Sequence, residues 1–217
     1  RHAIADHAES EVVTYPGWPS PRFMWDLWRA AGRAEAVYTF FASMHAVPAV
    51  IVAKARGRRF VVSVGGYDVA YVPEHGYGLR ARWPHRLVPG FVMRRSDRVL
   101  AISEAAREEA VAAGAPADRV EVVHLGLPER RVDAPEATPR DPDQVVTIAY
   151  VSAVSFSRKG IDRFVAAARN DPGRRYVLVG RVADDVVERL GDPPDNLRIT
   201  GHVDDDELDR ILWSSGV

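Results

Sequence analysis

A basic turn at residues 156–160, with the sequence FSRKG, is the first place where this chain could bind an anion. It follows an apolar run at 145–154 that predicts a buried strand, and it precedes an amphipathic helical pattern. We expect a helix to begin near Gly160, with its free amides at the carboxyl end of that strand, where open α/β sheets bind ligands. Arg158 and Lys159 add two charges, each worth roughly 4 kcal/mol at about 4 Å and an effective dielectric of about 20, before desolvation. The turn predicts a phosphate or diphosphate site; the alternative is a solvated basic turn.

A second candidate is the loop at 61–78, VVSVGGYDVAYVPEHGYG, where a strand ends in Gly65 and Gly66. Paired glycines let the backbone approach a ligand closely or adopt positive φ. A sugar hydroxyl needs carboxylate, phenol and imidazole partners. The loop supplies them in Tyr67, Asp68, Glu74, His75 and Tyr77. Of these, Asp68 and His75 are the catalytic candidates. The alternative is a long surface loop in which Asp68 caps a helix.

Several motifs are missing from the chain. The dinucleotide fingerprint, the P-loop and the nucleophile elbow do not occur, and the seven histidines have no metal-ligand spacing, so we expect no metal. His45 follows a predicted strand and either faces the same site or serves as a structural cap. His124 is similarly ambiguous.

Arginines and aromatic residues alternate at 79–98, and again at 21–33. Helices of this composition either dock on an anionic membrane surface or are half-buried, with arginine stems that cover apolar surface. Both interpretations remain open, so peripheral membrane contact is one of the expectations.

The composition of the chain predicts a globular protein. Its 217 residues are 47% hydrophobic, with 29 basic and 30 acidic residues, so no net field recruits nucleic acid. The absence of cysteine fits a reducing compartment. No apolar run reaches the roughly 18 to 20 residues that span a bilayer. The chain starts without Met and stops as an apolar segment begins, so we expect both ends to be truncated.

Short β-rich runs alternate with amphipathic helices, which is the pattern of βα units around a parallel sheet. The predicted strands are 36–41, 59–64, 99–102, 120–123, 145–151, 176–179 and 197–200. The predicted helices are 22–31, 46–55, 104–113, 161–168, 184–190 and 206–213. A segment at 127–144 with four prolines interrupts them. We therefore predict a partial Rossmann-like domain at 1–130, a linker at 131–144 and a second partial domain at 145–217.

These segments together resemble the family 4 glycosyltransferases, whose GT-B architecture places two Rossmann-like domains across a cleft. The resemblance rests on AVYTFFASMHAVPAVIVAKARGRRFVVSVGGYDVA, RVLAISEAAREEAVAAGAPADRVEVVHLGL, VVTIAYVSAVSFSRKGIDRFVAAARNDPGRRYVLVG and NLRITGHVDDDELDRILWSSGV. It implies that the first domain binds the acceptor, the second binds a nucleotide sugar, and Lys159 contacts the diphosphate. The chain departs from the family at two positions: the usual arginine six residues before the lysine is Ala153, and the usual histidine falls on Gly65.

The resemblance implies a retaining, metal-independent transfer of a sugar from a nucleotide-diphosphate donor to a glycan or lipid-linked acceptor. No cofactor is expected, since the nucleotide sugar is a substrate. It also implies a protein located in the cytoplasm, either free or bound peripherally to the inner face of the membrane. The family's glutamate pair would lie beyond Val217 and its opening glycine-rich unit before Arg1, so we expect the chain alone to be inactive. The alternatives are a non-catalytic two-lobed small-molecule binding protein and a nucleotide-sugar epimerase or dehydrogenase.

Overall fold

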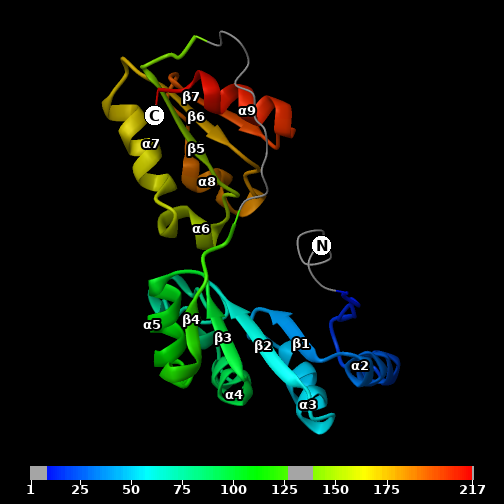
Figure 1. The fold of residues 1–217 in the computed structure, drawn as a ribbon. Helices are drawn as coiled ribbons and strands as arrows, with labels where there is room; N and C mark the ends of the chain where they lie inside the picture. Colours follow the sequence, from blue (N-terminus) through cyan, green and yellow to red (C-terminus); the bar gives the residue numbers. More distant parts are fainter. Residues whose placement is uncertain (1–8, 127–138, 217) are drawn as a thin grey trace. The chain divides into compact units, whose positions relative to one another are not determined.

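The protein, seen here as a computed structural model, is described over residues 9–126 and 139–216. It divides into two compact units, Arg1–Glu129 and Arg130–Val217, each an α/β unit with its own parallel sheet (Figure 1). Most of the predicted linker, at 131–138, lies outside the described residues. Its last residue, Gln144, is the first residue of a strand, so the predicted linker extends at least one residue too far.

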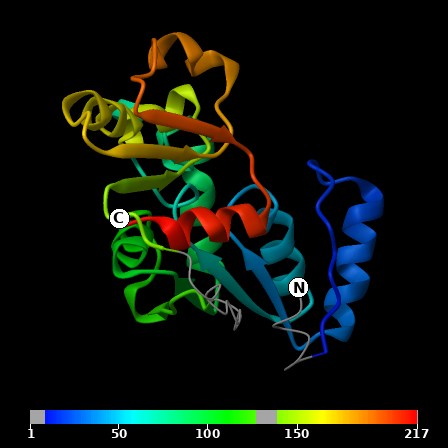
Figure 2. The same cartoon turned by 90° about the horizontal axis from the view of Figure 1, so that it is seen from above.

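The first unit is built on four parallel strands in the order β1-β2-β3-β4. The strands are β1 (Ala36–Phe40), β2 (Arg59–Val64), β3 (Arg98–Ala101) and β4 (Val120–Val122). The helices are α2 (Pro21–Arg33), α3 (Ala46–Ala55), α4 (Val88–Arg95) and α5 (Glu104–Ala112). Figure 2 shows α2 lying beside α3. The central strands are buried, as expected for a parallel sheet: Phe60, Val62 and Val99 are fully inaccessible.

Local sequence determines where the helices of this unit begin and end. The Ser20 hydroxyl accepts the Phe23 amide at 3.2 Å, and Pro21 occupies the first turn of α2, where a missing amide hydrogen costs nothing. In the same way the Ser103 hydroxyl accepts the Ala106 amide at the start of α5. Gly114, beyond the end of α5, has a φ of 97°. These residues bound α5, which matches the predicted helix at 104–113 to within one residue.

The second unit has three parallel strands in the order β5-β6-β7. They are β5 (Gln144–Ile148), β6 (Arg175–Val179) and β7 (Leu197–Gly201). The helices are α6 (Ala153–Arg158), α7 (Ile161–Asn170), α8 (Val187–Leu190) and α9 (Asp205–Ser214). One core forms where residues of α7 and α8 pack against strand residues such as Leu178, and a smaller one where Ile211 of α9 packs against Val177 and Val179.

The region after β5 differs from the prediction. The strand ends at Ile148 instead of residue 151, and a short helix, α6, follows it and includes the first residues of the basic turn, 156–158. Ser152 and Ser155 form a reciprocal capping box: the Ser155 amide donates to the Ser152 hydroxyl, and the Ser152 amide donates to the Ser155 hydroxyl at 2.7 Å. This cap starts a helix within an apolar run whose sequence predicts one continuous strand.

Two other helical segments also differ from the prediction. Residues 184–190 form a 3₁₀ turn, Asp184–Val186, followed by α8, in place of one α-helix. Helix α4 had no predicted bounds, because Pro89 and Gly90 in its first turn weaken the helical signal. A proline in the first turn is nevertheless compatible with a helix, since it has no intrahelical hydrogen bond to lose there.

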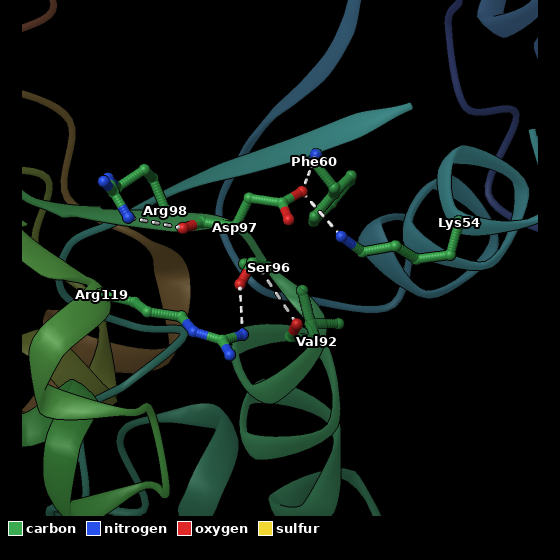
Figure 3. A network of polar contacts seen from close by, with 7 residues as sticks. All are labelled: Lys54, Phe60, Val92, Ser96, Asp97, Arg98 and Arg119. Atoms are coloured by element: carbon green, nitrogen blue, oxygen red, sulfur yellow. Dashed lines mark hydrogen bonds and ion pairs between the residues drawn. The ribbon is translucent and has the colours of Figure 1, made fainter. Parts of the chain in front are cut away.

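A polar network holds the amino end of β3 (Figure 3). One oxygen of Asp97 accepts both the Phe60 amide at 2.7 Å and the Lys54 ammonium at 2.6 Å, which connects β3 to β2 and to α3. Burial alone raises the pKa of Asp97, but the Lys54 hydrogen bond, the Phe60 amide and the charges of Lys54 and Arg119 together lower it. The ionised carboxylate is therefore the form that the fold stabilises.

We expect Asp97→Asn to lower the free energy of unfolding by about 1 kcal/mol, because the side chain is 43% exposed and solvent screens the ion pair. A carboxyl group whose pKa is lowered by folding stabilises the fold above its unfolded pKa. The advantage of the wild type should therefore be present above pH 3.8 and disappear as the pH falls through the folded-state pKa. Urea unfolding from pH 2.5 to 7 measures it. The exposed Asp118→Asn is the charge-matched control, and an equal effect of both variants would contradict the assignment.

Candidate functional site

The turns at the carboxyl ends of β1 and β2 are joined by one buried carboxylate. Asp68 is 1% exposed; its Oδ2 accepts the Ala42 amide at 2.9 Å, and its Oδ1 accepts the Gly65 amide at 3.1 Å. Burial raises the pKa of Asp68, against the opposing effect of the amides of Ala42 and Gly65. Both oxygens face inward, so this geometry favours the structural interpretation of Asp68 over direct contact with a sugar.

Gly65 and Gly66 follow β2 at the same edge of the sheet, where their backbone carries no side chains. Gly66 is exposed and has a φ of 93°, a conformation that other residues adopt only with strain. A Cβ at Gly65 would collide with the side chain of Ile102, which follows β3. Gly65 therefore packs closely against the neighbouring turn. Gly66, in contrast, is exposed and leaves its backbone accessible to a ligand at this edge.

The rest of the predicted sugar loop is anchored to the domain. Tyr67 is 38% exposed and stacks edge-on against Tyr77, with ring centroids 5.5 Å apart. Glu74 and His75 lie in a 3₁₀ turn, Pro73–His75, which the bridge between Val72 and Tyr77 closes. The structure thus brings Tyr67 together with the glycine turn, and places Glu74 and His75 in a separate turn of the same loop.

His45 holds the turn after β1 in place. Its Nε2 lies 2.9 Å from the Phe40 carbonyl, which can only accept, so Nε2 donates. Its Nδ1 then accepts from the Ser43 hydroxyl at 2.8 Å. The ring packs beside Tyr15, with centroids 6.2 Å apart. Both nitrogens of His45 are engaged, so the ring supports the turn. His124 likewise supports the segment after β4, where its Nδ1 lies 3.2 Å from the Ile102 carbonyl oxygen.

In the second unit the basic turn connects two helices. Arg158 is the last residue of α6, Lys159 is its C-cap, and Gly160 has a φ of 70° at the N-cap of α7. The prediction that a helix starts at Gly160 is confirmed, but the prediction that this helix directly follows the strand is wrong, because α6 lies between them. Lys159 is exposed and forms no ion pair with any residue in the described ranges.

The carboxyl ends of β5, β6 and β7 carry further polar groups. Ser152 follows β5, the exposed Arg181 follows β6, and the exposed His202 follows β7. The Ala153 amide at the start of α6 approaches a carboxylate oxygen of Asp185 at 3.4 Å. Within the described ranges, no group of three or more histidine, aspartate or glutamate side chains is arranged to hold a metal ion.

Comparison with known families identifies the first unit. Residues 5–126, more than half of the chain, match the glycosyl transferase 4-like domain. The chain belongs to this glycosyltransferase family. The predicted family is thereby confirmed, and the matched segment includes the turns after all four strands of the first sheet. No curated protein sequence matches the chain.

Solved structures of this fold include transferases and epimerases. HepE of Anabaena, in complex with UDP-glucose, is 17% identical with a TM-score of 0.61, over 94% of this chain and 57% of that one. The lipopolysaccharide outer core galactosyltransferase WaaB is 16% identical with a TM-score of 0.50, over 86% and 48%. The UDP-GlcNAc 2-epimerase of Neisseria meningitidis, bound to UDP-GlcNAc, is 12% identical with a TM-score of 0.52, over 94% and 60%.

These similarities confirm the predicted fold class, an α/β protein with two Rossmann-like parallel-sheet domains of the GT-B type. The chain spans less than two thirds of the length of each of these proteins. Because the epimerase shares the fold, the fold alone does not distinguish transfer from epimerisation. The domain matched by the first unit is a glycosyltransferase domain.

We expect Asp68→Ala to lower the free energy of unfolding by about 2 to 4 kcal/mol, because it leaves the buried amides of Ala42 and Gly65 without an acceptor. Asp68→Asn keeps one side-chain oxygen as an acceptor, so it should lower the free energy of unfolding by less than Asp68→Ala does. Since folding raises the pKa of Asp68, its contribution is complete below 3.8 and declines as the pH rises through the folded-state pKa. The wild type's advantage over Asp68→Asn should shrink in that direction in urea unfolding. Unchanged stability of Asp68→Ala would refute the carboxylate's role as a clamp.

Proposed function

We propose that this protein transfers a sugar, with retention and without a metal, from a nucleotide-diphosphate sugar to a glycan or lipid-linked acceptor. The observation that carries the proposal is the match of the first unit to a glycosyltransferase domain. It is supported by the likeness of the whole described fold to HepE, whose structure holds UDP-glucose. No cofactor takes part, since the donor is itself a substrate.

The donor diphosphate would bind at the turn between α6 and α7. Breaking the bond between sugar and phosphate places negative charge on the leaving diphosphate, and preorganised cations stabilise such charge as it develops. Lys159 offers an exposed ammonium, and Arg158 a guanidinium one residue earlier. The left-handed Gly160 turns the chain so that α7 starts directly after Lys159. The positive end of the ten-residue α7 adds a smaller term, about 0.3 to 1 kcal/mol.

The acceptor would bind at the carboxyl edge of the first sheet. Gly66 offers exposed backbone there, next to the half-buried Gly65, and the Tyr67 ring lies exposed beside it. Asp68 contributes by fixing the two turns, through its bonds to the Ala42 and Gly65 amides. Glu74 and His75 would reach a ligand from their own turn of the same loop.

The exposed aromatic residues favour a protein that works at the inner face of a membrane. Trp25 is 61% exposed, Trp83 is 69% exposed, and the Arg86 guanidinium lies 4.5 Å from the centre of the Trp83 ring. Indole rings flanked by arginines suit the boundary between lipid headgroups and acyl chains. In the described ranges, no helix combines the length and the apolar character that crossing a bilayer requires.

Thermal unfolding in the presence of UDP, GDP, UDP-glucose or NAD tests the donor site. We expect a nucleoside diphosphate to stabilise the wild type, by about 2.7 kcal/mol at a hundredfold excess over Kd, and NAD to have no effect. Lys159→Ala should weaken binding about tenfold or more, since it removes a direct charge contact.

The control is Arg163→Ala, which removes the same charge from an exposed position on the first turn of α7. Equal stabilisation of the wild type and Lys159→Ala would refute the diphosphate role of Lys159. Stabilisation by a free sugar, with none by any nucleotide, would support the two-lobed binding protein instead.

A further inference from the structure

Phe41, the residue that follows β1, has an unusual backbone conformation. Its φ is 72°, and it is the only residue other than glycine with a positive φ within residues 9–126 and 139–216. Such a conformation strains the backbone of a non-glycine residue, whereas glycine adopts it readily. The backbone therefore calls for glycine here, and the presence of phenylalanine has to be explained by its side chain.

Three hydrogen bonds hold this conformation in place. The Phe41 amide donates to the Ser63 carbonyl at 2.7 Å, and the next amide, that of Ala42, donates to buried Asp68. On the other side, the His45 ring donates to the Phe40 carbonyl. The backbone before and after Phe41 is thus fixed by groups from strand β2, from the turn that follows it and from the start of α3. The direction of its side chain is set before any ligand arrives.

The fixed side chain is not used to build the core. Phe41 is 38% exposed and meets Phe40 edge-on, with ring centroids 4.6 Å apart. Met44, on the same turn, is 45% exposed. Full burial of a phenylalanine side chain would stabilise the fold, so this turn forgoes much of that stabilisation in addition to bearing the strain. We name Phe40, Phe41 and Met44 the apolar turn.

The apolar turn lies next to the polar part of the same edge. The bonds from Phe41 to Ser63 and from Ala42 to Asp68 tie it to the end of β2, where the glycine turn and Tyr67 begin. In parallel α/β sheets, ligands bind at this edge. A ligand seated here meets hydrogen-bonding groups on the β2 side and the exposed apolar side chains of Phe40, Phe41 and Met44 on the β1 side, where Ser43 and His45 are hydrogen-bonded to each other. Sugar hydroxyls packed against the β1 side would lose their water partners without gaining others, which is unfavourable.

We propose that Phe41 is an acceptor-contacting residue, and that the acceptor carries an apolar chain or aglycone that packs on the apolar turn while its sugar meets the glycine turn. The proposal rests on the proposed function and narrows it, because it favours a lipid-linked acceptor over a free glycan. The strained backbone at Phe41 keeps the ring presented to this group.

The test uses octyl β-D-glucoside, below its critical micelle concentration, and glucose as probes of the whole chain, with binding followed by isothermal titration calorimetry. The wild type should bind the octyl glucoside at least tenfold more tightly than glucose. Phe41→Gly should weaken the binding of octyl glucoside by tenfold or more. It should not lower the melting temperature, since glycine relieves the backbone strain. Phe41→Tyr should retain binding.

Tyr38→Ala is the matched control, because Tyr38 is an aromatic residue of comparable exposure, 45% against 38% for Phe41, but lies in the middle of β1 and not beyond its carboxyl end. It should leave binding unchanged. Equal affinity of Phe41→Gly and the wild type, equal losses in Phe41→Gly and Tyr38→Ala, or equal affinity of the wild type for both probes would each overturn the proposal.

The same samples are tested for UDP-induced stabilisation. Loss of octyl glucoside binding in Phe41→Gly with an unchanged UDP effect locates the defect in the acceptor site. Absence of any nucleotide effect in the wild type refutes the donor function separately, whatever the octyl glucoside shows.

Discussion

The buried carboxylate of Asp68 is the constraint on which the edge of the first sheet depends. By accepting amides from the turns after β1 and β2, it converts two separate strand ends into one rigid surface. The cost of desolvating it is visible in the raised pKa. A buried acidic group kept at such a cost fits a surface whose shape matters for binding. The glycine turn, Tyr67 and the strained Phe41 all take their positions from it.

The sequence predicts the scaffold well because the scaffold follows from periodicity and local caps. Strand β2 and helix α3 have the predicted bounds, and α5 starts at the predicted residue, Glu104, where Ser103 caps it. Helix α6 escapes prediction, since its capping box uses two serines within an apolar run and its six residues are too few to show a helical period.

The site is less predictable, because its determinants are long-range contacts. Because aspartate is rarely buried, the sequence around Asp68 favours an exposed carboxylate that binds a ligand. Its burial is compensated by a hydrogen bond from the amide of Ala42, 26 residues away, which the local sequence does not reveal. The sequence around Phe41 likewise gives no sign of a positive φ, because hydrogen bonds to residues distant in sequence hold that conformation. The basic turn, in contrast, is local: Lys159 and Gly160 lie where a helix starts, as their spacing predicts. The polar edge of the second unit therefore follows more closely from the sequence than that of the first.

The contact between Gly65 and Ile102 limits which sequences this fold can reach. The family resemblance implies a histidine at position 65, yet any side chain there would collide with the branched Ile102. A smaller residue at 102 would have to come first, or at the same time, for a histidine to be accommodated. Positions 65 and 102 are thus coupled by packing, so we expect them to change together when sequences with this fold diverge.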